Sequence, residues 1–332
     1  MPKLKGLATG IGSLPHLDPE AAVELVLRYL PQIPFWPQLP KLGGQEGMTA
    51  QFMQNLPQSE ESLEVFYEKI INKDLGYFQI SKDSAAGLYA FKDKLQSSPQ
   101  LLKTIEFIKC QITGPFTVAA SLKNREGVAL LHDSVLMQAF IKGLAMKALW
   151  QIKFFKEFNK KIILFIDEPY LGCFGSAFTP LNRGDVVKGL GELSETIKSE
   201  EVLIGVHCCG NTDWSIFTDT PGIDIINFDA FSFLEKFVLY SENLRAFLER
   251  GGVVCWGIVP TQEFSGKETV DFLVKKLEDG LSILEKKGLG RDLLEEGLLI
   301  SPSCGLGALD TQKATQIFHL LSQTSAFLRK KF

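Results

Sequence analysis

Two cysteines and a histidine stand at the ends of predicted strands, and these residue types bind metal ions. His207 and Cys209 lie two residues apart in EVLIGVHCC, and Cys304 follows the apolar run GLLISPS. Side chains alternate between the two faces of a strand, so His207 and Cys209 should project to one side and Cys208 to the other. The pair alone is weak evidence, because buried cysteines often pack as small apolar residues. With Cys304 added, the residues form a Cys2His set, which is typical of catalytic zinc because the fourth position can stay open.

Carboxylates follow two further predicted strands. Asp229 ends the run IDIINFD and is the expected fourth occupant of the zinc site. Asp167 and Glu168 come directly after the apolar run IILFI. Such a pair could transfer protons, bind a substrate ammonium group or cap the next helix, and we expect both residues to be catalytic. His16, in the first loop, is a candidate substrate contact, whereas the cysteines outside the Cys2His set are interpreted as core or loop packing.

Strand-like and helix-like segments alternate along the whole chain, which indicates βαβ units and a parallel sheet. A doubly wound sheet would need a glycine-rich phosphate loop after the first strand, and GIGSLPH does not match GxGxxG. We therefore expect an α/β fold, a single closed (β/α)8 TIM barrel over residues 1–332, with functional residues at the C-terminal strand ends. The predicted strands are 7–13, 76–81, 105–113, 161–167, 201–209, 223–229, 252–259 and 297–303.

The predicted helices are amphipathic, and one long segment lacks any regular pattern. The helices are expected at 19–30, 132–159, 184–199, 236–250, 267–288 and 310–329. Segment 31–60 is too long for an ordinary connection, so we expect it to form a loop over the barrel mouth.

Composition excludes several classes of protein. The 332 residues are 45% hydrophobic and carry a formal charge of -4, which leaves no broad cationic surface for nucleic acid. The apolar runs are shorter than the ~18 residues that suggest a membrane span. The sparse cysteines and the N-terminal sequence, which lacks a signal-peptide core, lead us to expect a cytoplasmic protein with reduced thiols.

Five segments together resemble a known family. GIGSLP, ITGPFTVAASL, FIDEPYL, VHCCGNTDW and SPSCGLG look like the C-terminal catalytic barrel of cobalamin-independent methionine synthase, in the uroporphyrinogen decarboxylase-like superfamily. The resemblance implies a zinc ion held by His207, Cys209, Asp229 and Cys304. It also implies that Asp167 binds the amino group of homocysteine and that the GSLP segment, through Ile11 and Ser13, binds its carboxylate.

The chain departs from the family in four respects. Asp229 replaces a glutamate. The family's second amino-group ligand, a glutamate, would fall near Leu42, with only Gln45 and Glu46 close by. Gly257 stands where the family has a proton-donating histidine. The N-terminal barrel that helps to bind folate is missing, so the chain resembles the short core versions, which imply a methylated corrinoid protein or another simple donor.

These features predict a zinc-dependent transfer of a methyl group to a thiol. The expected thiol is homocysteine, which would give methionine, and the expected donor is a methylcorrinoid or a folate-type compound. Zinc-bound thiols lose their proton, which supplies the nucleophile. One alternative is a uroporphyrinogen decarboxylase-like lyase without metal, although the first loop LPHLDPEAAVEL lacks the arginines that this reaction needs. Another alternative is a non-catalytic barrel that binds zinc or docks to a corrinoid protein.

Overall fold

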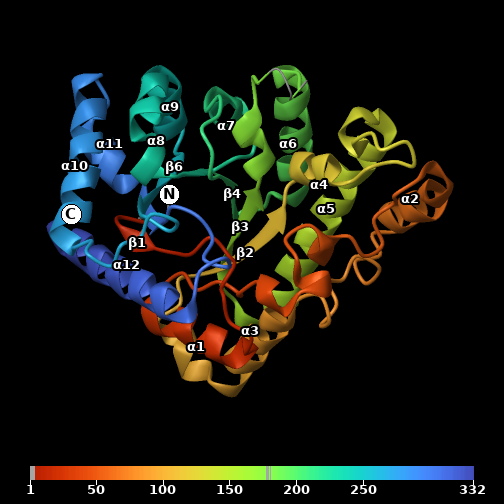
Figure 1. The fold of residues 1–332 in the computed structure, drawn as a ribbon, viewed down its shortest axis with the longest axis horizontal. Helices are drawn as coiled ribbons and strands as arrows, with labels where there is room; N and C mark the ends of the chain where they lie inside the picture. Colours follow the sequence, from red (N-terminus) through yellow and green to blue (C-terminus); the bar gives the residue numbers. More distant parts are fainter. Residues whose placement is uncertain (1–3, 177–178, 180) are drawn as a thin grey trace.

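The structure is a computed structural model that describes residues 4–176, 179 and 181–332. A parallel sheet forms its centre. Within these residues the sheet has seven strands in the order β1-β7-β6-β5-β4-β3-β2, and helices surround it (Figure 1). The strands are β1 (Leu7–Ala8), β2 (Phe107–Thr113), β3 (Lys161–Asp167), β4 (Val202–Cys208), β5 (Ile225–Phe228), β6 (Val253–Val259) and β7 (Leu298–Pro302). The helices are α1 (Pro19–Tyr29), α2 (Leu63–Ile71), α3 (Ala86–Ser97), α4 (Pro115–Ser121), α5 (Ser134–Phe155), α6 (Arg183–Ile197), α7 (Ser215–Asp219), α8 (Ala230–Phe237), α9 (Ser241–Glu249), α10 (Val270–Lys286), α11 (Arg291–Glu296) and α12 (Thr311–Lys331).

The strands bury both faces, and alternate residues belong to two different cores. In β3, Ile163 and Phe165 belong to a small inner cluster, whereas Ile162, Leu164 and Ile166 pack in the large core that includes helix residues. The inner cluster also takes residues from the other strands: Leu7, Phe107, Ile225, Val253, Cys255 and Leu299. Because β1 and β2 are the two edges of the sheet, their meeting in one cluster means that the sheet curls around these side chains.

The segment from Gln32 to Gln38 lies between the two edge strands. The N–H of Lys109 in β2 donates to the carbonyl of Pro34 at 2.8 Å, and the N–H of Gln38 donates to the carbonyl of Gly12, beyond β1, at 2.9 Å. Prolines at 34 and 37 have no N–H, so this segment cannot form a continuous ladder and makes isolated bridges instead. It joins the edges of the sheet without forming a regular strand.

The prediction of a strand at 76–81 is wrong. These residues form turns, and the N–H of Tyr77 donates to the carbonyl of Asp74. Phe78 and Ile80 are fully buried in the helix-side core, which explains the apolar pattern without a strand. A short apolar run cannot distinguish a strand from a buried turn. The predicted α/β class and parallel sheet are thus confirmed. The described residues form a curled sheet of seven strands, and not the closed barrel of eight strands that was predicted.

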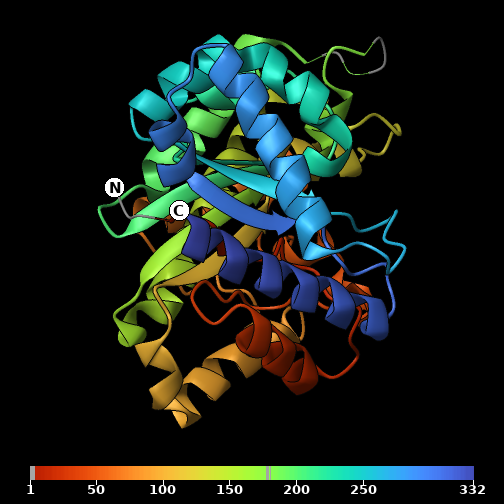
Figure 2. The ribbon, with the colours of Figure 1, turned by 90° about the vertical axis from the view of Figure 1, so that its left-hand side faces the viewer.

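The long helices cover the outer face of the sheet. Figure 2 shows α10 and α12 crossing beside β6 and β7, and α12 also packs on β1. The predicted helix over 236–250 is broken: α8 ends at Phe237, and α9 begins at Ser241. None of the helices in the described residues combines the length and the apolar character that a membrane crossing requires.

Candidate functional site

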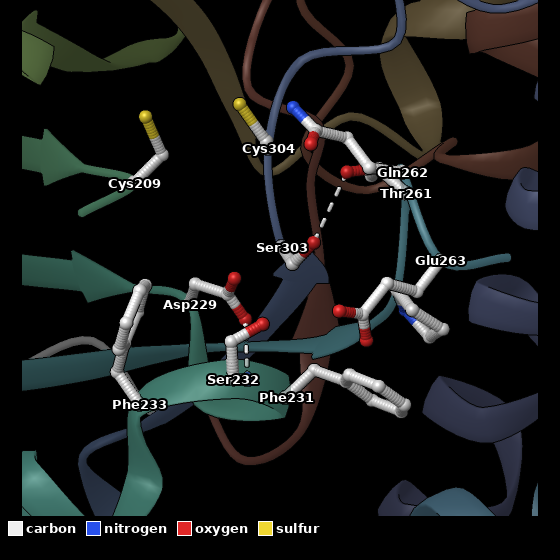
Figure 3. Close-up of a pocket in the computed structure, with 11 residues that line it drawn as sticks. Cys209, Asp229, Phe231, Ser232, Phe233, Thr261, Gln262, Glu263, Ser303 and Cys304 are labelled. Carbon is white, nitrogen blue, oxygen red and sulfur yellow. Dashed lines mark hydrogen bonds between the residues drawn. The ribbon is translucent and has the colours of Figure 1, made fainter. Parts of the chain in front are cut away.

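Among the described residues, His207, Cys209 and Cys304 form a group whose ligand atoms all lie within 4.8 Å of one another. His207 is the penultimate residue of β4, Cys209 follows that strand, and Cys304 follows β7. The curled sheet brings β4 and β7 to the same opening, so residues nearly a hundred positions apart meet there. In Figure 3 the sulfur atoms of Cys209 and Cys304 stand side by side.

Hydrogen bonds and charges among the three side chains shift their pKa values in directions that favour metal binding. A hydrogen bond with Cys304 lowers the pKa of Cys209 and raises the pKa of Cys304, and His207 also lowers the pKa of Cys209. Burial disfavours a charged His207 ring, but the hydrogen bond and charge of Cys209 outweigh burial and raise the pKa of His207. The directions of these shifts favour a thiolate on Cys209 over one on Cys304. Two sulfurs and an imidazole nitrogen at this spacing fit a tetrahedral zinc ion with one open position.

Asp229 is not part of this group. Its carboxylate accepts a hydrogen bond from the N–H of Ser232 at 2.9 Å and caps the N-terminus of α8 (Figure 3). Burial raises the pKa of Asp229. Asp229 also lines a pocket together with Cys209 and Cys304, so its role as the fourth ligand stays a prediction.

A cavity of about 540 Å³ opens beside the three ligand candidates. Its lining includes Ile11, Ser13 and Asp167, which were predicted to contact substrate, and segment 31–60 contributes Gln38, Pro40, Lys41, Glu46 and Met48. The long segment thus carries part of the wall of this cavity.

Two carboxylates face the cavity. Asp167 is 4% exposed, and its Oδ1 has no hydrogen-bond partner among the described residues. Burial raises the pKa of Asp167 to about 6, opposed by the nearby Lys109. Glu46 is 3% exposed and accepts from the N–H of Ala86 at 2.6 Å and from Gln51 at 3.2 Å, while burial raises its pKa. An unpaired carboxylate oxygen in a buried wall is costly unless a ligand donates to it.

Glu168 has a different role from its neighbour. Its carboxylate accepts from the N–H groups of Phe116 at 3.0 Å and Thr117 at 2.9 Å, and from the Thr117 hydroxyl at 2.6 Å. These bonds hold the N-terminus of α4, and Glu168 does not line the cavity. Burial raises the pKa of Glu168 to about 7. Of the interpretations left open by the sequence, helix capping fits the observed bonds of this residue, and a catalytic role stays a prediction.

His16 does not line this cavity, and its predicted contact with substrate stays a prediction. Its side chain is partly buried, and its Nδ1 has no hydrogen-bond partner in the part of the chain that the structure describes. Burial lowers the pKa of His16. The first loop turns after Ser13, so a residue three positions further on no longer faces the strand ends.

The first loop and the loop after β7 are packed tightly against each other. The N–H of Gly307 donates to the Ser13 hydroxyl at 3.2 Å, and the N–H of Leu306 donates to the Ser13 carbonyl at 2.9 Å. A Cβ at Gly305 would lie 2.2 Å from the Ser13 hydroxyl, so only glycine allows this approach. The glycines that follow Cys304 therefore bring Ser13 close to the ligand candidates.

Gly257 has no room for a side chain. A Cβ there would lie 2.6 Å from the Phe228 carbonyl oxygen and 2.9 Å from the Ser303 Cα. Both neighbours are backbone atoms and cannot move away easily. Backbone atoms therefore occupy the space that a side chain at position 257 would need, including the histidine that the resemblance led us to look for.

Polar residues inside the curled sheet escaped the sequence analysis. Lys109 in β2 is fully buried; its Nζ donates to the Ile11 carbonyl and to Gln111, and burial lowers its pKa to about 8. Asn227 in β5 is also fully buried, with its Oδ1 2.5 Å from Nδ1 of His207. The sequence feature that could have identified both residues is a polar residue at an inward-facing position of an otherwise apolar strand.

The fold and site together define an α/β protein whose curled parallel sheet carries a His-Cys-Cys group and a carboxylate-lined cavity at the C-terminal strand ends. No family model and no curated protein matches the chain. Among solved structures, it is similar to a B12-independent methionine synthase from Shewanella sp. W3-18-1 in complex with selenomethionine. That match has 20% identity, covers 71% of this chain and 67% of the other, and has a TM-score of 0.49.

A second similar structure is a glycoside hydrolase family 138 enzyme targeting pectin rhamnogalacturonan II. It has 12% identity, covers 82% of this chain and 36% of the other, and has a TM-score of 0.29. Both TM-scores lie below 0.5, so the fold described above rests on this chain's own strands and hydrogen bonds.

Proposed function

We propose that the protein is a zinc-dependent methyltransferase that methylates the thiol of an amino acid. The substrate we propose first is homocysteine, whose methylation gives methionine. The observation that carries this proposal is the His207, Cys209 and Cys304 group at the wall of a cavity that also holds buried carboxylates. Zinc, when bound, lowers the pKa of a coordinated thiol, so that the thiol reacts as a thiolate at neutral pH.

The ligand set suits catalysis because it leaves one coordination position for substrate. His207, Cys209 and Cys304 would hold the metal, and Asp229, which lines a pocket with both cysteines and caps α8, would be a fourth ligand that the substrate thiol displaces. Three protein ligands with an open fourth position are typical of catalytic zinc, whereas structural zinc is usually enclosed by four.

The polar wall suits an amino acid. Asp167 and Glu46 would bind the substrate ammonium group, since Oδ1 of Asp167 accepts no hydrogen bond from any residue that the structure describes. Ser13 and Lys41 also line the cavity and would hold the substrate carboxylate through a hydroxyl and an ammonium group. These opposite charges would orient the substrate with its thiol toward the cysteines.

The methyl donor remains a methylcorrinoid or a folate-type compound in this proposal, and Gly257 favours the former. A folate nitrogen leaves more easily when it is protonated, whereas a corrinoid cobalt leaves without taking up a proton. Gly257 provides no acid and cannot accept a side chain.

The proposal is tested by zinc content and X-ray absorption at the zinc edge, with and without homocysteine. Purified protein should bind one zinc ion per chain, and addition of the thiol should add one sulfur to its ligands. Cys304→Ser should lose zinc and methyl transfer, whereas Cys173→Ser should keep both because Cys173 is exposed and lies outside the group. A chain that takes up no zinc, or a Cys304→Ser variant that stays active, would refute the proposal. Zinc that binds tightly but never gains a sulfur would favour the non-catalytic alternative.

A further inference from the structure

We propose that Asn227 is a positioning residue for His207: its amide oxygen holds the imidazole with the proton on Nδ1 and leaves Nε2 free for the metal. This inference rests on the proposed function, because it assumes that His207 is a zinc ligand. Asn227 itself would touch neither metal nor substrate.

The sheet places the two side chains next to each other. His207 in β4 pairs with Asn227 in β5 in the parallel register, so both side chains project into the curled sheet. His207 is 3% exposed, Asn227 is fully buried, and Nδ1 of the ring lies 2.5 Å from Oδ1 of the amide. At this depth, water does not compete for the contact.

The surrounding contacts fix which end of the amide faces the ring. Asn227 Nδ2 donates to the carbonyl oxygen of Cys255 at 2.9 Å and to the Ser301 hydroxyl oxygen at 2.8 Å. A carbonyl oxygen can only accept, so the amide nitrogen must face Cys255. The Ser301 hydroxyl gives its own proton to the Pro302 carbonyl at 2.8 Å, which leaves its lone pairs for Asn227. Both amide hydrogens are therefore used.

This orientation decides the state of the imidazole. With Oδ1 facing the ring, Nδ1 of His207 must be the donor, since an amide oxygen has no proton. In a neutral ring the lone pair then lies on Nε2, the nitrogen left for the metal and the two sulfurs. Histidine ligands of metals are commonly oriented in this way, by a bond from the other ring nitrogen to an oxygen acceptor.

The same amide connects the strands that carry the ligands. Through Asn227, β5 is bonded to His207 in β4, to the Cys255 carbonyl in β6 and to Ser301 in β7. Cys304 lies three residues beyond Ser301. A single buried side chain thus links the strand that supplies His207 and Cys209 with the strand that leads to Cys304. Because the amide is neutral, this link adds no charge beneath the metal.

Two substitutions separate positioning from packing. Asn227→Asp and Asn227→Leu both remove the amide nitrogen that serves Cys255 and Ser301, but only aspartate keeps an oxygen acceptor for His207. We expect Asn227→Leu to weaken zinc binding by about 10-fold to 100-fold and Asn227→Asp to restore most of that loss. Ser301→Ala is the matched control, because it removes one partner of the amide and leaves Oδ1 in place.

Zinc affinity is measured by competition with a chromophoric chelator, and the stability of each metal-free variant is measured by urea unfolding. Equal zinc affinities in wild type and Asn227→Leu, or equal losses in the Asp and Leu variants, would overturn the positioning role. A wild-type chain that binds no zinc would instead refute the proposed function.

Long-range ¹⁵N–¹H NMR of the wild type tests the tautomer directly, without any substitution. In the zinc-loaded chain, we expect the single ring proton of His207 on Nδ1. A proton on Nε2 would overturn the inference even if the variants fail to fold.

Discussion

Replacing Asp167 by asparagine should weaken the binding of amino-acid thiols while leaving simple thiols unaffected. The Asp167 carboxylate is 4% exposed, and its Oδ1 has no partner within the described part of the chain. A hydrogen bond to a charged group contributes about 1.5–3 kcal/mol. Since each 1.4 kcal/mol is a tenfold change in affinity, the substitution should raise the Kd about 10-fold to 150-fold. Asparagine has nearly the same shape, so the change removes charge and leaves the packing intact.

The assay is isothermal titration calorimetry of the zinc-loaded protein with two ligands, homocysteine and its analogue in which hydrogen replaces the amino group. Wild type should prefer homocysteine, and Asp167→Asn should remove most of that preference. Glu46→Gln should act in the same direction, because Glu46 lines the same cavity. An equal loss of affinity for both ligands would show that Asp167 does not bind the ammonium group, and the reasoning about the cavity would then fail.

Three further predictions concern the scaffold. Lys147 is fully buried, its Nζ has no partner within residues 4–176, 179 and 181–332, and burial lowers its pKa from 10.5 to about 7. The unfolded chain keeps this proton up to a higher pH than the folded chain, so stability should rise as the pH rises from 7 toward 10.5. Lys147→Met should therefore stabilise the fold at pH 6.5 by up to about 5 kcal/mol, and the gain should shrink at higher pH; urea unfolding with no such trend would contradict this. Glu168→Ala should lower the free energy of unfolding by about 1–3 kcal/mol by freeing the N-terminus of α4, with zinc affinity kept; loss of zinc without loss of stability would contradict the capping role. Gly257→Ala should destabilise the chain by about 1–3 kcal/mol in the same assay, because its Cβ meets backbone, and a neutral effect would mean that the strand ends can separate.

Part of the site could be predicted from local sequence. His207 and Cys209 fall on one side of β4 because strand side chains alternate, and Cys208 belongs to the opposite, helix-side core. Cys304 was predicted to join them because a closed barrel brings the ends of its fifth and eighth strands together across its mouth. Those predictions needed only the strand period and the direction of the strands.

Other assignments could not be made from sequence because a side chain had more than one possible partner. Asp229 and Glu168 each follow a strand, as a ligand or acid would, and each also accepts bonds from the N-terminus of a helix. A carboxylate before a helix can serve either purpose, and the choice depends on distances that sequence does not contain. The run 76–81 failed for a similar reason, since burial in a turn and burial in a strand give the same apolar pattern.

The sequence by itself determined the α/β class, the parallel strands and the three residues that can hold a metal, because each follows from periodicity and residue type. Only the tertiary structure decided that segment 32–38 joins the edges of the sheet, that Glu46 and Asp167 share one cavity, and that the amide of Asn227 lies against the ring of His207. Those contacts join residues distant along the chain. They exist only because the sheet curls and brings its strand ends together.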